Sequence, residues 1–146
     1  MSRFDFNHKL HDLGIKIENE LKPHLNELFD TEFNKRSTNV FDVMDFISKD
    51  GKIVIEVKGR TCSSTQYKDT IITCNKVREA DALMEQDPEV EVYFFFVYTD
   101  KTKYIKVPKE DRDWKVKLTG TWNIEHYLIP VDELKDVDDI EIKSNQ

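Results

Sequence analysis

The sequence predicts an α/β protein of the α+β type, in which helices flank a mixed β-sheet. Three observations support this class: a helical periodicity over residues 10–28, two alternating segments joined by Asp50-Gly51, and a nearly continuous apolar and aromatic run over residues 90–98. The chain has 146 residues, and no repeat or Pro/Gly/Ser-rich linker divides them. We therefore expect a single domain over residues 1–146.

The first predicted element is a long helix, because apolar residues recur at steps of three and four. Pro23 lies inside this pattern and has no backbone N–H to donate, so we expect a kink or a break near residues 19–23. The periodic apolar residues are Leu10, Leu13, Ile17, Leu21, Leu25 and Leu28.

Residues 39–47 and 52–58 are predicted to pair as an antiparallel hairpin, because Asp-Gly between two extended runs is a strong turn signal. An even-length loop centred on Asp50-Gly51 places Asp45 opposite Glu56. Successive side chains of a strand point to opposite faces. One face then carries Asp45, Glu56 and Lys58, and the other carries Met44, Phe46, Ile53, Ile55 and Val57.

A short strand, a second helix and a central buried strand are expected next, followed by extra strands. The predicted order is therefore α-β-β-β-α-β plus extra C-terminal strands. The expected ranges are 70–73 for the short strand, about 75–84 for the helix, 90–98 for the central strand, and 104–107, 114–118 and 127–130 for the extra strands.

The net charge of −7 argues against a general affinity for nucleic acid. Residues 52–78 nevertheless carry six basic and two acidic side chains, so a polyanion site there stays open beside a mixed, solvated surface. The acidic segment at about residues 131–146 is expected to be solvated. Because the chain shows no signal-peptide pattern and no apolar stretch long enough to cross a membrane, we expect a soluble cytoplasmic protein. Cys62 and Cys74 fit no metal-ligand spacing or disulfide framework.

Opposed carboxylates at Asp45 and Glu56 would repel each other, and a divalent cation offsets such repulsion. The alternative to a cation site is a solvent-exposed hairpin face over which the charges are spread. Glu56-Val57-Lys58, following an acid on the preceding strand, resembles the signature of the PD-(D/E)XK nuclease superfamily. The flanking residues 45–47 and 53–60 look like its small viral and Holliday-junction-resolvase-like members. The resemblance covers about residues 10–98 and implies a restriction-endonuclease-like core.

The resemblance also implies an activity, a divalent-metal-dependent endonuclease that hydrolyses DNA phosphodiester bonds, with branched or junction DNA as one substrate. Asp45 and Glu56, with the backbone carbonyl of Val57, are the implied ligands of Mg²⁺, for which Mn²⁺ can substitute. Lys58 is implied to orient or deprotonate the attacking water. Cutting both strands of a duplex requires two active sites, so a homodimer is one expected assembly. A viral member would act in the host cell cytoplasm.

Five further positions are given roles beside these. Glu18, on the first helix, would complete the metal shell or bind a second ion, with Glu20 as its competitor. Gly14 lies four residues before Glu18 on the same helix face and would let the helix approach the sheet. The implied contacts to backbone phosphates are Arg60, Lys68 and Lys76.

Other interpretations stay open at this point. The same fold could be a catalytically inactive binding or assembly module, and an unrelated α+β interaction protein could contain Glu-x-Lys by coincidence. Asp42 is a rival for the first acid, although the hairpin register places it on the wrong face. Three aromatic residues could contact nucleic acid by stacking on bases, but simpler interpretations exist: a core position for the tyrosine, and a core or edge-covering position for the two tryptophans. They are Tyr67, Trp114 and Trp122.

Overall fold

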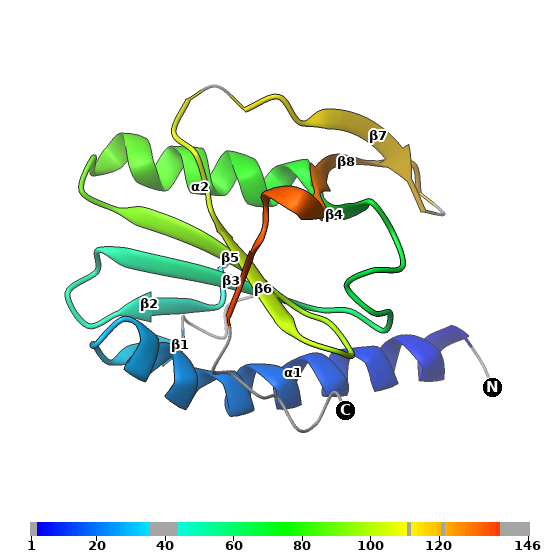
Figure 1. Ribbon diagram of the computed structural model, residues 1–146, viewed down its shortest axis with the longest axis horizontal. Helices are drawn as coiled ribbons and strands as arrows, with labels where there is room; N and C mark the ends of the chain where they lie inside the picture. The colour runs from blue at the N-terminus through cyan, green and yellow to red at the C-terminus, as the bar shows by residue number, and fades with distance from the viewer. Residues whose placement is uncertain (1–2, 36–43, 111, 121, 138–146) are drawn as a thin grey trace.

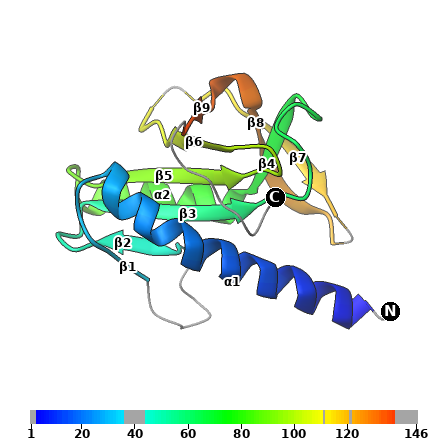
Figure 2. The same ribbon diagram turned by 60° about the horizontal axis from the view of Figure 1, so that its bottom comes forward.

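The computed structural model describes residues 3–35, 44–110, 112–120 and 122–137. A six-stranded sheet of order β1-β2-β3-β5-β6-β9 lies between two helices, one on each face, as Figures 1 and 2 show. The helices are α1 (Arg3–Leu28) and α2 (Cys74–Gln86), and the strands are β1 (Phe33–Lys35), β2 (Phe46–Ser48), β3 (Ile53–Gly59), β5 (Glu91–Val97), β6 (Thr102–Lys106) and β9 (Lys135–Asp136). The strands β3 and β5 run parallel and the other pairs are antiparallel, which confirms the predicted mixed sheet.

A second sheet of three strands lies beside the N-terminal end of α2 (Figure 1). Its order is β4-β8-β7, with β4 (Asp69–Thr73), β7 (Lys115–Thr119) and β8 (Ile124–Pro130). The prediction of one sheet is wrong here, because β4 pairs with β8 from the C-terminal part and not with the hairpin. Sequence periodicity found these strands but carries no information about such distant partners.

The helix α1 is continuous across Pro23, so the predicted break near residues 19–23 is absent. Ile17, Leu21 and Leu25 flank the proline on both sides, and all three are buried against the sheet. Burial of these three side chains outweighs the loss of one backbone hydrogen bond.

The two faces of the sheet form two separate cores. The core under α1 contains Phe46, Ile55 and Phe95, and the core under α2 contains Val54 and Phe94. Adjacent phenylalanines of β5 are fully buried on opposite sides, which confirms the predicted central strand. The prediction is wrong for Met44, which packs with the α2 core. Met44 precedes the first residue of β2, so strand alternation does not govern it.

The predicted hairpin register is confirmed, with Phe46 opposite Ile55 and Ile47 opposite Val54. The connecting loop covers residues 49–52. Gly51 adopts a φ of +76°, a backbone conformation that favours glycine, and its N–H donates to the Ser48 carbonyl over 2.9 Å. The even-length loop is therefore centred on Asp50-Gly51 and preserves the pairing.

The acidic C-terminal segment is folded where the structure describes it. Residues 131–133 form a 3-10 turn, β9 pairs with β6, and Leu134 and Val137 are buried. The prediction of a solvated segment is therefore wrong for residues 131–137, because two apolar side chains there find partners in the core. Residues 138–146 lie outside the described residues. Neither helix of the described chain is long and apolar enough to span a membrane.

Candidate active site

The centre of the candidate site is a pair of carboxyl groups from neighbouring strands. Asp45 immediately precedes β2, and its backbone N–H donates to the Ile55 carbonyl over 3.0 Å. Its carboxylate accepts the N–H of Val57 over 2.7 Å, between Asp45 Oδ2 and the backbone nitrogen. These two bonds hold the Asp45 carboxylate against β3 beside Glu56, as the register predicts.

The Glu56 side chain is only 1% exposed, and one of its carboxylate oxygens forms ion pairs with two lysines. The Nζ atoms of Lys58 and Lys76 lie 3.0 and 3.1 Å from Glu56 Oε2. The other oxygen, Oε1, is buried and has no hydrogen-bond partner among the residues that the structure describes. A buried carboxylate oxygen without a partner costs free energy, so it needs an explanation.

Its surroundings raise the pKa of Glu56 to about 7. Burial is the largest cause, because it disfavours the charged form, and the negative charge of Asp45 raises the pKa further. The charges of Lys58 and Lys76 act in the opposite direction. A group that titrates near neutral pH inside a protein is typical of functional sites.

The acidic pair fits a divalent cation. Carboxylate oxygens are the preferred ligands of hard ions such as Mg²⁺, and Mg²⁺ sites commonly use one or two carboxylates together with water and substrate phosphates. Within the described ranges, no three His, Cys, Asp or Glu side chains gather as a metal-ligand cluster. Among the described residues, Asp45 and Glu56 are the carboxylates that the hairpin brings together here.

Comparison with known proteins identifies the family. A protein-family model described as "Phage putative PDDEXK endonuclease" matches residues 13–141. The chain belongs to this family. The match confirms the resemblance to the PD-(D/E)XK superfamily, and it extends beyond residue 98 into the C-terminal strands. No curated protein and no solved structure matches the chain.

The proposed helix ligand of this PD-(D/E)XK domain, Glu18, is not part of the acidic pair. Glu18 is half-buried on α1 beside Ile17, whose side chain packs on the sheet face opposite to Glu56. The prediction that Gly14 lets the helix approach the sheet is wrong, because a Cβ added there would meet nothing within 4 Å. The close approach occurs at Gly59, where a Cβ would lie 2.8 Å from Ile17 Cδ1. A glycine directly after Glu-x-Lys was the available sequence signal.

Arg60, a predicted phosphate contact, is held by its own chain. Its Nε donates to Thr70 Oγ1 over 3.2 Å, its Nη2 donates to the Ile71 carbonyl, and the guanidinium lies 5.4 Å from the centre of the Phe96 ring. Burial lowers the pKa of Arg60, and the charge of Glu56 is among the smaller effects that raise it. The guanidinium is therefore fixed in place by hydrogen bonds to its own chain.

The two predicted lysine contacts lie in different settings. Lys68 is exposed on the loop before β4, as a phosphate contact requires. Lys76, in the first turn of α2, reaches into the site and pairs with Glu56. Sequence analysis placed Lys76 at the start of this helix but could not foresee its partner, because the docking of α2 depends on tertiary contacts. Asp42, the rival acid, lies outside the described residues.

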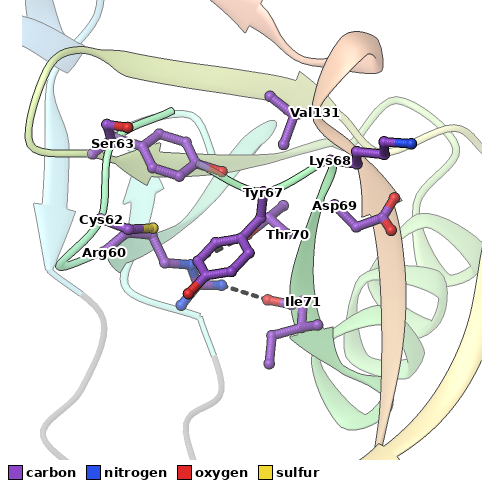
Figure 3. Close-up of a pocket in the computed structure, with 10 residues that line it drawn as sticks. Arg60, Cys62, Ser63, Tyr67, Lys68, Asp69, Thr70, Ile71 and Val131 are labelled. Atoms are coloured by element: carbon purple, nitrogen blue, oxygen red, sulfur yellow. Dashed lines mark hydrogen bonds between the residues drawn. The ribbon is translucent and has the colours of Figure 1, made fainter. Parts of the chain in front are cut away.

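The three aromatic residues separate clearly by burial. Trp114 is buried, and its Nε1 donates to Glu133 over 3.3 Å, which confirms a role in the core. Tyr67 is 62% exposed and Trp122 is 76% exposed, so a core position is wrong for both, and the edge-covering role of Trp122 stays a prediction. Tyr67 lines a pocket of about 440 Å³ together with Arg60 and Lys68 (Figure 3). Nothing in the sequence indicated this pocket, because its walls come from four separate segments.

Proposed function

We propose that this chain is a divalent-metal-dependent endonuclease that hydrolyses DNA phosphodiester bonds. The observation that carries the proposal is the Glu56 carboxyl group, which is buried beside Asp45 with one oxygen lacking a partner within the described part of the chain. The large majority of buried polar side-chain atoms in folded proteins have a hydrogen-bond partner. The orphaned oxygen therefore favours a ligand that is held jointly with Asp45.

The proposed ligand is Mg²⁺, for which Mn²⁺ can substitute, held by the carboxylates of Asp45 and Glu56 with the Val57 carbonyl as a further oxygen. When bound, such an ion lowers the pKa of water and neutralises charge on phosphoryl oxygens. Glu18 remains a proposed additional ligand, which would have to reach the acidic pair from α1.

Lys58 is proposed to act on the attacking water and on the phosphate. It follows Glu56 by two residues on the same face of β3, and its Nζ lies 3.0 Å from Glu56 Oε2. A lysine held there can orient the water and, as the neutral amine, take its proton, which converts the amine to the ammonium form. As the ammonium it donates a hydrogen bond to the negative charge that develops on the phosphate. Lys76 adds a second positive charge at the same place.

Basic residues next to the site would hold the DNA backbone. Lys68 is exposed, and Arg60, which directly follows β3, is held by hydrogen bonds to Thr70 and Ile71. Contacts of this kind supply affinity that falls with salt and does not depend on sequence. Branched or junction DNA is the proposed substrate form, and a homodimer is the proposed assembly for cutting both strands of a duplex.

A second candidate function is a catalytically inactive binding or assembly module of the same fold. The observation that favours it is the pairing of Lys58 and Lys76 with Glu56 Oε2, which compensates the buried negative charge without any cation. The two candidates differ in their need for a metal ion and in the effect of removing Lys58.

The test is cleavage of supercoiled plasmid and of a synthetic four-way junction with Mg²⁺ or Mn²⁺. We expect the wild type to cut in a metal-dependent way, and Glu56→Gln and Lys58→Ala to lose about 10²- to 10⁴-fold in rate. Glu91→Gln is the matched control, because Glu91 also pairs with a lysine, Lys106, over 3.1 Å but lies away from the acidic pair. Wild type that cuts neither substrate with either ion would favour the inactive module. Unimpaired cutting by Glu56→Gln would contradict the assigned site.

A further inference from the structure

The pocket of about 440 Å³ has a volume typical of small-ligand sites. It lies between the loop that follows β3, the strand β4 and the end of β5, and Val131 closes one side (Figure 3). Its lining combines two basic residues, Arg60 and Lys68, with Tyr67, Thr70 and Ile71, and it includes one acidic residue, Asp69. Neither the acidic pair nor its two lysines line it, so it is a separate feature of the surface.

The strand β3 connects this pocket to the acidic pair. Arg60 directly follows β3, and the alternation of the strand continues to it from Glu56 through Lys58. At about 3.3 Å per residue, Arg60 lies roughly 13 Å along the chain from Glu56. A strand of B-form DNA rises about 3.4 Å per nucleotide, so this span corresponds to roughly four nucleotides. A nucleic-acid strand lying over the acidic pair would therefore reach the pocket.

The walls of the pocket combine flat apolar surface with positive charge. Tyr67 presents a largely exposed ring, whose hydroxyl accepts a hydrogen bond from Gln66 over 3.3 Å. Ile71 adds apolar surface that is 37% exposed. The Arg60 guanidinium is fixed by Thr70 and Ile71, and Lys68 stands at the rim (Figure 3). An exposed aromatic ring beside basic side chains is the arrangement with which proteins stack bases and hold the attached phosphates.

We propose that this pocket binds an unpaired nucleotide of the substrate strand, a few nucleotides from the bond that is cut. The base stacks on Tyr67 and the adjoining phosphate pairs with Lys68. A base inside a duplex is stacked and paired, so only an unpaired or extruded base can enter a pocket of this kind. The proposal rests on the proposed nuclease function and deepens it, because it makes unpaired nucleotides near the cut a determinant of substrate choice.

The experiment uses oligonucleotides that carry 2-aminopurine at successive positions across a duplex–single-strand boundary. Binding is measured with EDTA present, so that the strand stays intact. We expect the fluorescence to change at one or two neighbouring unpaired positions only. Tyr67→Ala should abolish that change and weaken binding by about 5- to 150-fold, the range for loss of one stacked base. Tyr67→Phe keeps the ring and should behave as the wild type.

Trp122→Ala is the matched control, because Trp122 is also a largely exposed aromatic residue and does not line the pocket. Lys68→Ala is a second pocket variant and should weaken binding of the same oligonucleotide while Trp122→Ala does not. Equal fluorescence profiles for Tyr67→Ala and Trp122→Ala would overturn the proposal. A fully paired duplex that binds as tightly and loses as much in Tyr67→Ala would also overturn it.

Cleavage of the same oligonucleotides with Mn²⁺ separates this proposal from the nuclease function. Cutting by the wild type without a position-specific signal would overturn the pocket and leave the nuclease in place. A position-specific signal without any cutting would support the pocket and overturn the nuclease. Free deoxynucleoside monophosphate serves as a competitor: we expect it to displace the strand only at high concentration, because it lacks the backbone contacts near the acidic pair.

Discussion

The two faces of the strand β3 bury their side chains almost equally, but the buried side chains are chemically different. On one face Ile55, fully buried, packs with Phe46 and the apolar stripe of α1. On the other face Glu56, 1% exposed, lies under α2 with an oxygen that lacks a partner in the described residues. Burying an aliphatic side chain stabilises the fold by about 1.5–3 kcal/mol, whereas a buried carboxyl group with an unsatisfied oxygen lowers stability.

The two faces of β3 therefore have different roles in our account. The Ile55 face contributes the free energy that holds α1 and the sheet together. On the Glu56 face, two lysines pair with one carboxylate oxygen, and the other oxygen lacks a partner in the described residues. Such a cost in stability is expected at the proposed active site. Substitutions on the two faces should therefore have opposite signatures in stability and in activity.

The largest expected effect on stability comes from the apolar face. Ile55→Ala removes fully buried methyl groups, so the free energy of unfolding should fall by about 2–5 kcal/mol. Cleavage per folded molecule should stay close to that of the wild type, because Ile55 points away from the acidic pair. Chemical denaturation and plasmid cleavage measure the two quantities. A loss of activity larger than the loss of folded protein would break the separation of the two faces.

The next effect is a pH dependence that belongs to Glu56. Its pKa rises from 4.5 to about 7 on folding, so the folded protein keeps a proton that the unfolded chain releases. Protonation of Glu56 therefore contributes to the free energy of unfolding. This contribution is fully present below about pH 4.5 and is lost as the pH rises to about 7, with a total change of about 3 kcal/mol.

This change is measured as the difference in unfolding free energy between wild type and Glu56→Gln, with a chelator present. The difference isolates Glu56 from the other titrating groups. Between pH 4.5 and pH 7 the unfolding free energy of the wild type should fall by about 3 kcal/mol relative to that of Glu56→Gln. A difference that is constant with pH would show that Glu56 titrates normally, and would remove the electrostatic contrast between the two faces.

The features that the sequence predicted are those fixed by local chemistry. Asp50-Gly51 and the alternation of the flanking residues determine the register that sets Asp45 beside Glu56. The three phenylalanines of β5 predicted a strand buried on both sides, because no exposed position interrupts them. In both cases the relevant interactions lie within a few residues along the chain or in the strand itself.

The features that the sequence missed depend on contacts between distant segments. The strand β4 pairs with β8, so that Thr70 lies opposite Ile129, and no local pattern specifies such a partner. Lys76 reaches Glu56 only because α2 docks over β3. The strands β1 and β9 are three and two residues long, too short for any periodicity.

The smallest effect concerns the point where α1 meets β3. In Gly59→Ala the new Cβ would lie 2.8 Å from Ile17 Cδ1, so the isoleucine must shift, at a cost of about 1 kcal/mol. Ile17→Val removes that methyl group and costs about 0.5–1.5 kcal/mol by itself. The double variant should cost less than the two single changes together. Additive costs would show that the contact does not set the distance between helix and sheet.

The central claim is that Asp45 and Glu56 together hold a divalent cation, and Mn²⁺ binding tests it most directly. Titration calorimetry at pH 8, where Glu56 is mostly ionised, compares wild type with Glu56→Gln and with the matched control Glu91→Gln. We predict a Mn²⁺ site in wild type and Glu91→Gln that is lost or at least 10-fold weaker in Glu56→Gln. Identical isotherms for all three proteins would contradict the account.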